Sequence, residues 1–308
     1  MFEFAIHASV SSFKDASYSL RKYLQSHAIE SVLLGVSGGA DSVLALHLLA
    51  VAASKLPGFR LYAAHVNFHL RGDESMRDEE FVRSLAMLYP DVTFFFKDCD
   101  TTSFARKNGV SIEMAARDLR HNWWRQLQAQ YNIGFIATGH NANDNEETLM
   151  LNLLRGSSPA GLRGMYPLAS GIFRPLLGIY RRDILRLLGN LYCREWDINN
   201  WDVNNGDGLR ADIMKSILDR YPEGYVTDSS NLSSDFRRNF LRNEILPLLE
   251  SRWEGMHNAF LTSLELQGEA AAIVERNVAD VLSSERSRNG SLLSWATISN
   301  FPAPLTLI

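Results

Sequence analysis

The sequence has little cysteine and no long apolar run. Its 308 residues include two cysteines, Cys99 and Cys193, which lie far apart in the chain. Their separation excludes a CxxC redox or zinc pair and fits a reducing compartment, so we expect a cytoplasmic protein. No apolar stretch reaches the roughly 20 residues that a bilayer span requires. The start, MFEFAIHASVSSFKDAS, lacks the basic and apolar regions of a secretory signal. We therefore expect neither export nor a membrane partner.

The sequence also lacks an excess of basic charge. Lysine and arginine number 31 against 35 aspartates and glutamates, which gives a net charge of -4. The total charge does not favour a nucleic-acid partner, so such a partner would need a local basic patch. Hydrophobic residues at 46% and charged residues at 21% are ordinary for a globular protein, and the length allows a full domain with a second, smaller one.

Apolar runs and helical patterns alternate through most of the chain. We expect strands at Ser31–Val36, Leu61–Phe68, Val92–Lys97, Ile133–Thr138 and Gly171–Phe173. The spacing predicts helices at Asp41–Ala53, Ser75–Tyr89, Ser111–Tyr131, Asp144–Arg155 and from Ile179 onward. Strands that are apolar on both faces and alternate with helices indicate a parallel sheet covered on both sides. The predicted fold class is therefore α/β, with a doubly wound, mainly parallel five-stranded sheet.

The rest of the chain departs from this alternation. Residues Asn199–Gly224 are rich in Asn, Asp and Gly and indicate an insertion, which we interpret as a surface loop with a short helix, ADIMKSILDRY, inside it. Helical patterns at Arg238–Leu249 and Trp253–Leu282 then predict a small α-helical domain. We therefore divide the chain into an α/β domain, 1–225, and a helical domain, 226–308. The apolar ending, FPAPLTLI, is a segment that usually packs on something, so we expect a truncated C-terminus.

The segment LLGVSGGADSVLALHLLA contains the first candidate site. Residues Ser37–Ser42 (SGGADS) interrupt an apolar strand just before a helical pattern resumes. Paired glycines let backbone N–H groups turn inward, and the helix points its positive dipole end at the same place, so we expect an anion site. Asp41 suits such a site when Mg²⁺ bridges it to phosphate oxygens. The alternative is a glycine turn in which Asp41 and Ser42 cap the helix. The motif matches neither a Walker loop nor a dinucleotide-binding glycine pattern.

A second polar segment, ATGHNANDNEETLMLNLLRG at 137–156, follows the fourth predicted strand. On a helix Asp144, Glu147 and Thr148 lie at positions i, i+3 and i+4 and share one face. Two carboxylates on a first turn can hold Mg²⁺ or an ammonium group. Alternatively they only complement the helix dipole, as acidic first turns commonly do. Ligands bind beyond the carboxyl ends of strands where the strand order reverses, so we expect the first and fourth strands to be neighbours there.

Six motifs in one order resemble those of the tRNA(Ile)-lysidine synthetases, which belong to the N-type ATP pyrophosphatases. They are SGGADS, HVNFHLRGDES (His65–Ser75), SIEMAARDLRHNWW (Ser111–Trp124), TGHNANDNEET (Thr138–Thr148), LLRGSSPAGLRGM (Leu153–Met165) and DSSNLSSDFRRNFLRNEILP (Asp228–Pro247). Together they cover the chain from about Ser31 to Leu249. Their order is more specific than any one motif, and it implies a fold like that of the adenine nucleotide α-hydrolases.

The resemblance implies an ATP-dependent ligase that forms a C–N bond on tRNA. In this family ATP adenylates O2 of cytidine 34 in the CAU anticodon of tRNA(Ile), and pyrophosphate leaves. The ε-amine of free lysine then attacks C2 of the cytosine and AMP leaves, which gives lysidine. The expected co-substrate and metal are ATP and Mg²⁺, and the expected partners are tRNA(Ile) and free L-lysine. A homodimer is compatible with this architecture.

The resemblance also assigns roles to residues of the motifs. It implies ATP binding by Ser37, Gly38, Gly39, Ala40, Asp41, Ser42, His65, Arg117 and Gly139. The catalytic residues would be Asp41, Arg117, Asp144 and Glu147, with Asp41 and Asp144 on the metal and Asp144, Glu147 and Thr148 on the lysine. The tRNA would contact Arg155, Arg163, Arg181, Arg182, Arg237, Arg238 and Arg242. For His65 a core or capping role is an equal alternative, and a charge run is usually a solvated face.

One position departs from the family pattern, and other functions stay open. The GHxxxD motif often has a second Asp before Asp144, and this chain has Asn143 there, so one metal ligand is missing. The nearest alternative is another ATP pyrophosphatase, such as a tRNA thiolase, a GMP synthetase or an NAD synthetase. The unpaired cysteines argue against a thiolase, and no amidotransferase region is visible. A non-catalytic nucleotide-binding module is the alternative from another class, and lysine dependence separates it from the ligase.

Overall fold

In the computed structural model, which describes residues 3–7, 9–195, 208–227 and 237–289, the chain forms two compact units. The described part of the larger unit comprises residues 3–144 and 166–227, and that of the smaller unit residues 145–165 and 237–289. The division at residue 225 stays a prediction. Most of the non-helical part of the predicted insertion (199–207), the start of the last motif (228–236) and the apolar ending lie outside the described residues. Across the described ranges, every helix is too short or too polar to span a bilayer.

The larger unit contains a six-stranded sheet with the order β3-β2-β1-β4-β6-β5. Its strands are β1 (Ser31–Gly35), β2 (Arg60–Asn67), β3 (Thr93–Asp98), β4 (Phe135–Ala137), β5 (Leu168–Ala169) and β6 (Ile172–Phe173). All neighbours are parallel except β5 and β6, which are antiparallel. The predicted mainly parallel sheet is confirmed, and the fifth predicted strand is β6. The sheet has one strand more than predicted, β5, because two residues before a tight turn give no readable period.

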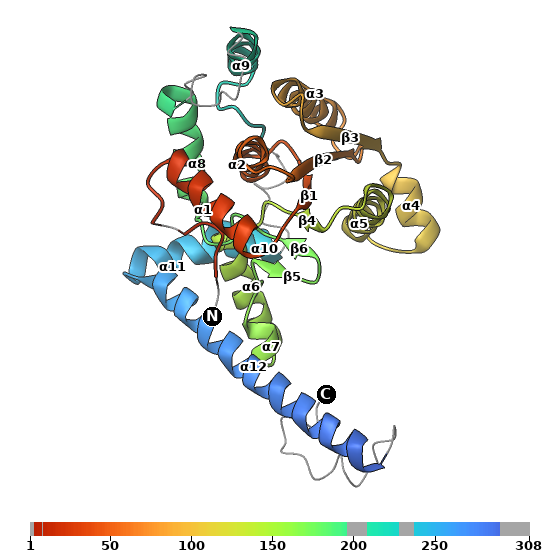
Figure 1. Cartoon of the computed structure of the whole chain (residues 1–308), viewed down its shortest axis with the longest axis vertical. Helices are drawn as coiled ribbons and strands as arrows, with labels where there is room; N and C mark the ends of the chain where they lie inside the picture. The colour runs from red at the N-terminus through yellow and green to blue at the C-terminus, as the bar shows by residue number, and fades with distance from the viewer. Residues whose placement is uncertain (1–2, 8, 196–207, 228–236, 290–308) are drawn as a thin grey trace. The chain divides into compact units, whose positions relative to one another are not determined.

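Helices cover both faces of this sheet (Figure 1). The larger unit contains α1 (Phe13–Ser26), α2 (Ala40–Lys55), α3 (Asp73–Leu88), α4 (Thr101–Asn108), α5 (Ile112–Tyr131), α8 (Arg181–Asn190) with a π-helical segment Leu191–Glu195, and α9 (Gly208–Arg220). The side chains of Val32 and Leu34 join the apolar cluster shared with α1, α2 and α8. Leu33 lies on the opposite face and joins the cluster formed with Trp124 and Leu127 of α5. This alternation along β1 confirms the doubly wound arrangement.

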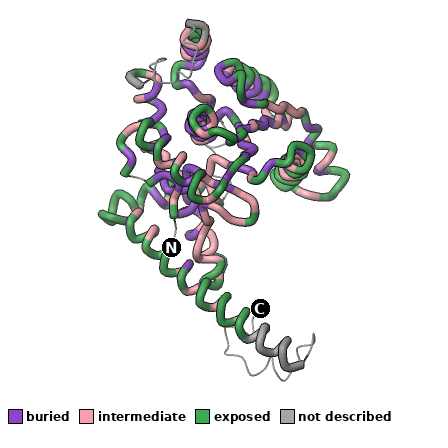
Figure 2. The backbone as a smooth tube through the Cα atoms, in the orientation of Figure 1, coloured by how far each residue is buried: buried purple, intermediate pink, exposed green. Residues whose placement is uncertain are grey.

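Helix α2 is the most deeply buried helix of the larger unit. Twelve of its residues are buried, and Figure 2 shows it purple along most of its length. Each fully buried leucine, such as Leu44, Leu46 or Leu48, stabilises the fold by about 1.5–3 kcal/mol. The helix follows β1 after a loop of only four residues, so this burial also fixes the position of residues 36–39.

The smaller unit is helical, and its residues 237–289 contain the C-terminal helices that the sequence predicted. Its helices are the greater part of α6 (Ala142–Arg155), α7 (Pro159–Leu162), α10 (Arg237–Phe240) continued by a π-helical segment Leu241–Ile245, α11 (Leu246–Arg252) and α12 (Met256–Asn289). Asn145 joins two of its segments, because its Oδ1 accepts a hydrogen bond from the backbone N–H of Met165 at 2.6 Å. His257 of α12 contacts Glu146 of α6, with 2.7 Å between Nδ1 and Oε1.

Candidate active site

The carboxyl ends of β1 and β4 meet where the strand order reverses. β1 pairs with β2 on one side and with β4 on the other, so Leu33 lies between Tyr62 and Ile136. The prediction that the first and fourth strands are neighbours is therefore confirmed. Chains leaving two such strands diverge to opposite sides and open a crevice, which is where doubly wound proteins bind ligands.

The loop after β1 is held by hydrogen bonds among its own serines. Ser42 Oγ donates to the backbone oxygen of Gly39 at 2.9 Å and accepts from the backbone N–H of Ser37 at 3.2 Å. The backbone N–H of Gly39 lies 3.3 Å from Ser37 Oγ. Gly39 is the residue before α2 and lacks a side-chain cap, so the first turn of the helix keeps its dipole open to a ligand.

Gly38 has a backbone conformation that other residues rarely adopt. Its φ is 93°, and an added Cβ would lie 2.7 Å from Cγ2 of Val226. The backbone oxygen of Gly38 also accepts from the N–H of Val226 at 3.0 Å. The loop before α2 is therefore in close contact with the segment after α9. Glycine is required at position 38 because of its positive φ and because no space is left for a Cβ atom.

The two predicted motifs line one cavity of about 310 Å³. An added Cβ on Gly139, in the loop after β4, would lie 3.1 Å from the backbone N of Ser42, which shows how closely the loops approach. Predicted residues in the lining are Ser37, Gly39, Asp41, Ser42, Arg117 and Gly139. The others are Gly35, Val36, Ala64, Val66, Phe68, Arg120, His121, Trp124, Thr138, His140, Ile172 and Arg174. The sequence thus predicted the glycine and aspartate side of the cavity and missed most of the facing wall.

The facing wall is cationic. Arg117, Arg120 and Arg174 line the cavity, and among the described residues of its lining Asp41 is the one that is acidic. Burial lowers the pKa of Arg120, and the neighbouring Arg117 lowers it further; burial also lowers the pKa of Arg174. The Nε atoms of Arg120 and Arg174 are buried and have no hydrogen-bond partner within the described part of the chain. Desolvated donors of one sign around an open space fit an anionic ligand.

The missed residues of α5 carry a signal that the sequence contains. Arg117, Arg120, His121 and Trp124 lie at i, i+3, i+4 and i+7, so they form one face of the helix. Trp124 is buried and packs on Gly35, while its neighbour Trp123 joins the same apolar cluster at its edge. The ring of Trp124 thus packs in the core and also forms part of the cavity wall.

Asp41 is already paired in the structure. Its Oδ2 accepts from Nη1 of Arg181 at 2.6 Å, and its Oδ1 accepts from Nδ2 of Asn141 at 3.2 Å. Burial raises the pKa of Asp41, Arg181 opposes that rise, and the charge of Asp144 adds to it. Arg181, predicted to contact tRNA, thus lies against the phosphate loop.

Asp144 caps α6. Its Oδ2 accepts from the backbone N–H of Asn141 at 2.9 Å, and Asn141 Oδ1 accepts from the backbone N–H of Asp144 at 3.1 Å. This reciprocal pair is a capping box, so the helix-dipole alternative describes part of what Asp144 does. Asn141 contacts both Asp41 and Asp144 and so bridges the two predicted metal ligands.

The two carboxylates fit a metal that arrives with a nucleotide. Within the described ranges no three His, Cys, Asp or Glu side chains come together as a ready-made metal site. Mg²⁺, however, is usually bound through one or two carboxylates together with substrate phosphates and water. Asp41 and Asp144 can supply those carboxylates, so the donor set suits Mg²⁺ bound with phosphate and not a metal held by protein alone.

His65 has the core role that was the alternative for it. The residue is buried, and its Nδ1 donates to the backbone oxygen of Val36 at 2.8 Å. Burial lowers its pKa. The residues on either side of it, Ala64 and Val66, line the cavity, whereas His65 is outside the lining. Its predicted contact with ATP stays a prediction.

In the smaller unit Glu147 binds two of the arginines predicted to contact tRNA. The Glu147 side chain is 0% exposed, and its oxygens accept from Nε of Arg238 at 2.6 Å and from Nε of Arg242 at 2.6 Å. Removing a partner from such a buried pair is strongly destabilising, so these contacts fix α10 and the π-helical segment to α6. The predicted lysine contact of Glu147 and Thr148 stays a prediction.

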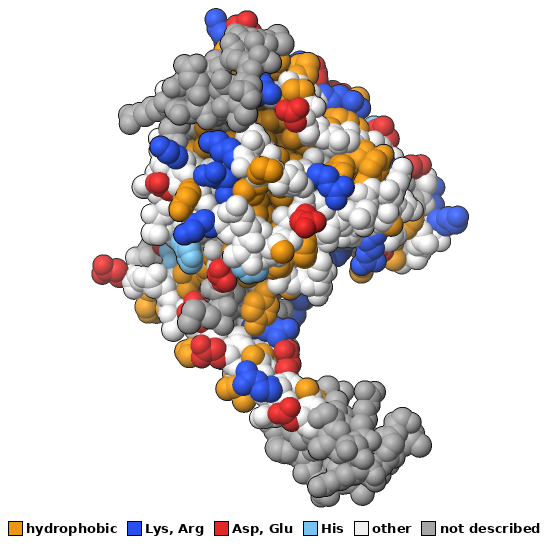
Figure 3. Space-filling model, in the orientation of Figure 1, with side chains coloured by type: hydrophobic (Ala, Val, Ile, Leu, Met, Phe, Trp, Pro, Cys, Tyr) orange, Lys and Arg blue, Asp and Glu red, His pale blue; other side chains and the backbone are white. Residues whose placement is uncertain are grey.

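The remaining predicted tRNA contacts are dispersed. Arg155 and Arg237 are exposed, Arg163 pairs with Glu275 at 2.6 Å, and Arg182 on α8 is 69% exposed. Figure 3 shows basic and acidic side chains interspersed on the face in view. The predicted clusters therefore contain several arginines that are already engaged by protein carboxylates.

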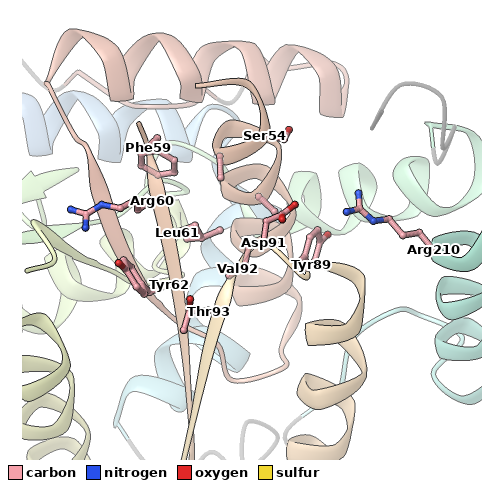
Figure 4. Close-up of a pocket in the computed structure, with 12 residues that line it drawn as sticks. Ser54, Phe59, Arg60, Leu61, Tyr62, Tyr89, Asp91, Val92, Thr93 and Arg210 are labelled. Carbon is pink, nitrogen blue, oxygen red and sulfur yellow. The ribbon is translucent and has the colours of Figure 1, made fainter. Parts of the chain in front are cut away.

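A second cavity, of about 320 Å³, lies at the opposite edge of the sheet (Figure 4). Its lining includes the start of β2, the start of β3, the last turns of α2 and Arg210 of α9. The labelled side chains in Figure 4 are Ser54, Phe59, Arg60, Leu61, Tyr62, Tyr89, Asp91, Val92, Thr93 and Arg210. No residue of its lining belongs to a predicted site.

Two curated proteins are similar to this chain over most of its length. A tRNA(Ile)-lysidine synthase from Bacteroides thetaiotaomicron is 34% identical over 247 residues, which are 80% of this chain and 50% of that protein. One from Porphyromonas gingivalis is 37% identical over 278 residues, 90% of this chain and 53% of that protein. The chain thus spans about half the length of these curated relatives.

The fold has a solved counterpart in the U34-tRNA thiolase NcsA from Methanococcus maripaludis. That structure matches with a TM-score of 0.58 and 17% identity, over 83% of this chain and 79% of the other, which shows a shared fold. The PP-loop domain family matches residues 13–202, a range that contains the sheet, the SGGADS loop and the cavity. The chain belongs to the PP-loop domain family.

Proposed function

We propose that this chain is the catalytic part of a tRNA(Ile)-lysidine synthase that acts in the cytoplasm. The observation that carries the proposal is the cavity at the carboxyl ends of β1 and β4, in which the SGGADS loop faces Arg117, Arg120 and Arg174. ATP is the anion we propose for it. The names of the relatives support lysine transfer to tRNA(Ile), because both are 34% identical or more over most of this chain.

The proposed reaction has two steps that balance without a covalent enzyme intermediate. The O2 atom of the anticodon cytosine attacks the α-phosphorus of ATP, and pyrophosphate leaves. The ε-amine of lysine, after losing a proton, attacks C2 of the activated cytosine, and the C2–O bond to AMP breaks. Mg²⁺, held with ATP by Asp41 and Asp144, would neutralise phosphate charge.

The chain's own residues would act by position and charge. The N–H groups of the uncapped first turn of α2 and the hydroxyls of Ser37 and Ser42 would bind the phosphates. Arg117 and Arg120 would stabilise the charge that develops at the α-phosphate, since donors fixed in a desolvated site need no reorganisation during reaction. Apolar residues of the lining, such as Val66 and Phe68, offer a surface for a flat base.

Lysine transfer tests the proposal directly. Labelled lysine, ATP and Mg²⁺ are incubated with an isoleucine tRNA transcript that has a CAU anticodon and with a matched transcript that has UAU. We expect label on the CAU transcript alone, and none with an Asp41→Ala protein. AMP release without label would favour another ATP pyrophosphatase, and nucleotide binding without AMP release would favour a non-catalytic module.

A second measurement separates Asp144 and Glu147, two of the three predicted lysine ligands. We expect Asp144→Asn to raise the KM for lysine. Glu147→Gln should mainly lower the stability of the smaller unit, because the two guanidinium groups lose their charged partner. Its effect on the KM for lysine should be small, because an ammonium ion must compete with those two groups for Glu147. A rise in lysine KM for Glu147→Gln without loss of stability would restore Glu147 as a lysine ligand. The homodimer is a proposal that mass measurement would test. Crosslinking would test the proposed tRNA contacts of Arg155, Arg163, Arg181, Arg182, Arg237, Arg238 and Arg242.

A further inference from the structure

The Arg181–Asp41 pair joins two residues that the motifs placed in different sites. Nη1 of Arg181 lies 2.6 Å from Oδ2 of Asp41, and the two side chains are 41% and 27% exposed. The other oxygen of Asp41 accepts from Asn141, so both oxygens are engaged by protein donors. A half-buried pair with this geometry is stronger than the usual surface ion pair.

Asn143 explains why Arg181 is there. Its Oδ1 accepts from the backbone N–H of Arg181 at 2.9 Å, at the start of α8. Tyr180, the residue before α8, provides no side-chain cap of its own, so Asn143 caps the helix from a distant part of the chain. An amide oxygen does this without adding negative charge. The family motif often has an aspartate at this place in the sequence. In this chain the residue is Asn143, and it fixes the place of Arg181.

We propose that Arg181 is a resident counter-cation for Asp41, positioned by Asn143, which holds that carboxylate until a metal–nucleotide replaces it. A bare divalent cation must then displace a guanidinium from its ligand, whereas a metal bound to ATP also brings phosphates that give Arg181 a new partner. The inference rests on the proposed function only in assigning ATP and Mg²⁺ to the cavity, and it predicts that the nucleotide-free protein binds divalent metal weakly.

Manganese binding tests the proposal without any turnover. Free Mn²⁺ is titrated into nucleotide-free protein and followed by electron paramagnetic resonance. We expect Arg181→Gln to bind Mn²⁺ at least about tenfold more tightly, because a positive charge next to the ligand is removed. Adding Asp41→Asn should abolish the gain. Arg182→Gln, the next residue on the same helix, should leave Mn²⁺ affinity unchanged. Equal Mn²⁺ affinity in folded Arg181→Gln and the unaltered protein would overturn the proposal.

Two further measurements keep the proposal testable if Arg181→Gln folds poorly. Asn143→Ala retains the charge of Arg181 and loosens its placement, so Mn²⁺ affinity should rise by less than in Arg181→Gln. Calorimetry of ATP binding in EDTA should show weaker binding by Arg181→Gln than by Arg182→Gln. Unchanged Mn²⁺ affinity in Asn143→Ala, or equal ATP binding by the two arginine variants, would count against the exchange. If the unaltered protein transfers no lysine but the variants show the expected Mn²⁺ affinities, the proposed function is refuted and the role of Arg181 is not.

Discussion

The two cavities of the larger unit have nearly the same volume, about 310 Å³ and 320 Å³, and lie at opposite edges of one sheet. Helix α2 runs between them. The carboxyl-edge cavity, at the carboxyl ends of β1 and β4, is lined by Gly39, Asp41 and Ser42 at the start of α2. The amino-edge cavity, at the starts of β2 and β3, is lined by Ala53 and Ser54 near the end of α2. The positive end of the helix dipole therefore faces one cavity and the negative end the other.

The difference shows that volume does not mark the site. Both linings contain more arginine than aspartate side chains, so the sign of the charge does not separate the cavities either. What separates them is the start of α2, whose first turn has no side-chain cap, and the buried Nε atoms of Arg120 and Arg174. The comparison predicts that matched changes at the two edges have very different effects on nucleotide binding.

The largest effect is expected from Gly38→Ala. The new methyl group meets Val226, and the positive φ costs a side chain about 1–2 kcal/mol. The contact with Val226 adds a cost of similar size. If the loop leaves its present conformation to avoid both costs, nucleotide affinity should fall by about 100-fold. Calorimetric titration with ATP measures the change.

Gly58→Ala is the matched control for that change. Gly58 also has a positive φ, 86°, but nothing lies within 4 Å of an added Cβ, and it precedes the strand start at the amino edge. It should lose stability by about 1–2 kcal/mol from strain and keep its ATP affinity. Equal losses of affinity in both variants would mean that general destabilisation, and not the loop, explains the effect of Gly38→Ala.

Arg120→Gln should change affinity and stability in opposite directions. A charge-assisted hydrogen bond contributes about 1.5–3 kcal/mol, so ATP affinity should fall by at least about tenfold. The nucleotide-free protein should be as stable or more stable in urea, because a desolvated charge beside Arg117 has been removed. A less stable protein with unchanged ATP affinity would assign Arg120 to the fold and not to the ligand.

The strands and helices of the larger unit were predictable where a pattern of neighbouring residues indicates them. The apolar runs located β1 to β4, and the helix predicted from Ser111 agrees with α5, where Ser111 Oγ accepts from the backbone N–H of Met114. Helices α1 and α4 were not predicted, because α1 lies before the motifs and α4 is a short element.

The site was predictable where it is local and not where it depends on tertiary contacts. The loop after β1 and the turn before α6 each lie within a few residues, so their chemistry could be read directly. The pairs Arg181–Asp41 and Arg238–Glu147 join residues 140 and 91 positions apart. Two arginines of the clusters predicted to contact tRNA thus form ion pairs with carboxylates of the same chain, and no spacing in the sequence indicates such pairs.

A smaller effect is expected from the buried histidine behind the amino-edge cavity. His47 contacts the hydroxyls of Tyr89 and Tyr192 through its two ring nitrogens, and burial lowers its pKa to about 3. The unfolded chain takes up the proton near pH 6.5, so the unfolded state binds more protons below that pH. This contribution to stability is present above about pH 6.5 and is lost as the pH falls toward 3.

Urea unfolding of His47→Gln between pH 5 and 6.5 measures that contribution. The free energy of unfolding should depend less on pH than in the unaltered protein, by about one proton, or about 1.4 kcal/mol per pH unit. An unchanged slope would mean that His47 is already protonated in the folded protein. Because His47 lies outside the lining of both cavities, ATP affinity at pH 7.5 should stay close to that of the unaltered protein.

The smallest effect is expected at the amino edge itself, and a matched arginine pair measures it. Arg210→Gln removes a guanidinium from that cavity, and Arg174→Gln removes one from the carboxyl-edge cavity. ATP affinity should fall by about tenfold in Arg174→Gln. In Arg210→Gln it should stay within about a factor of two, because substitutions away from a site change free energies by less than about 0.5 kcal/mol. Similar losses in both variants would show that nucleotide binding depends on overall charge and not on which end of α2 faces the ligand.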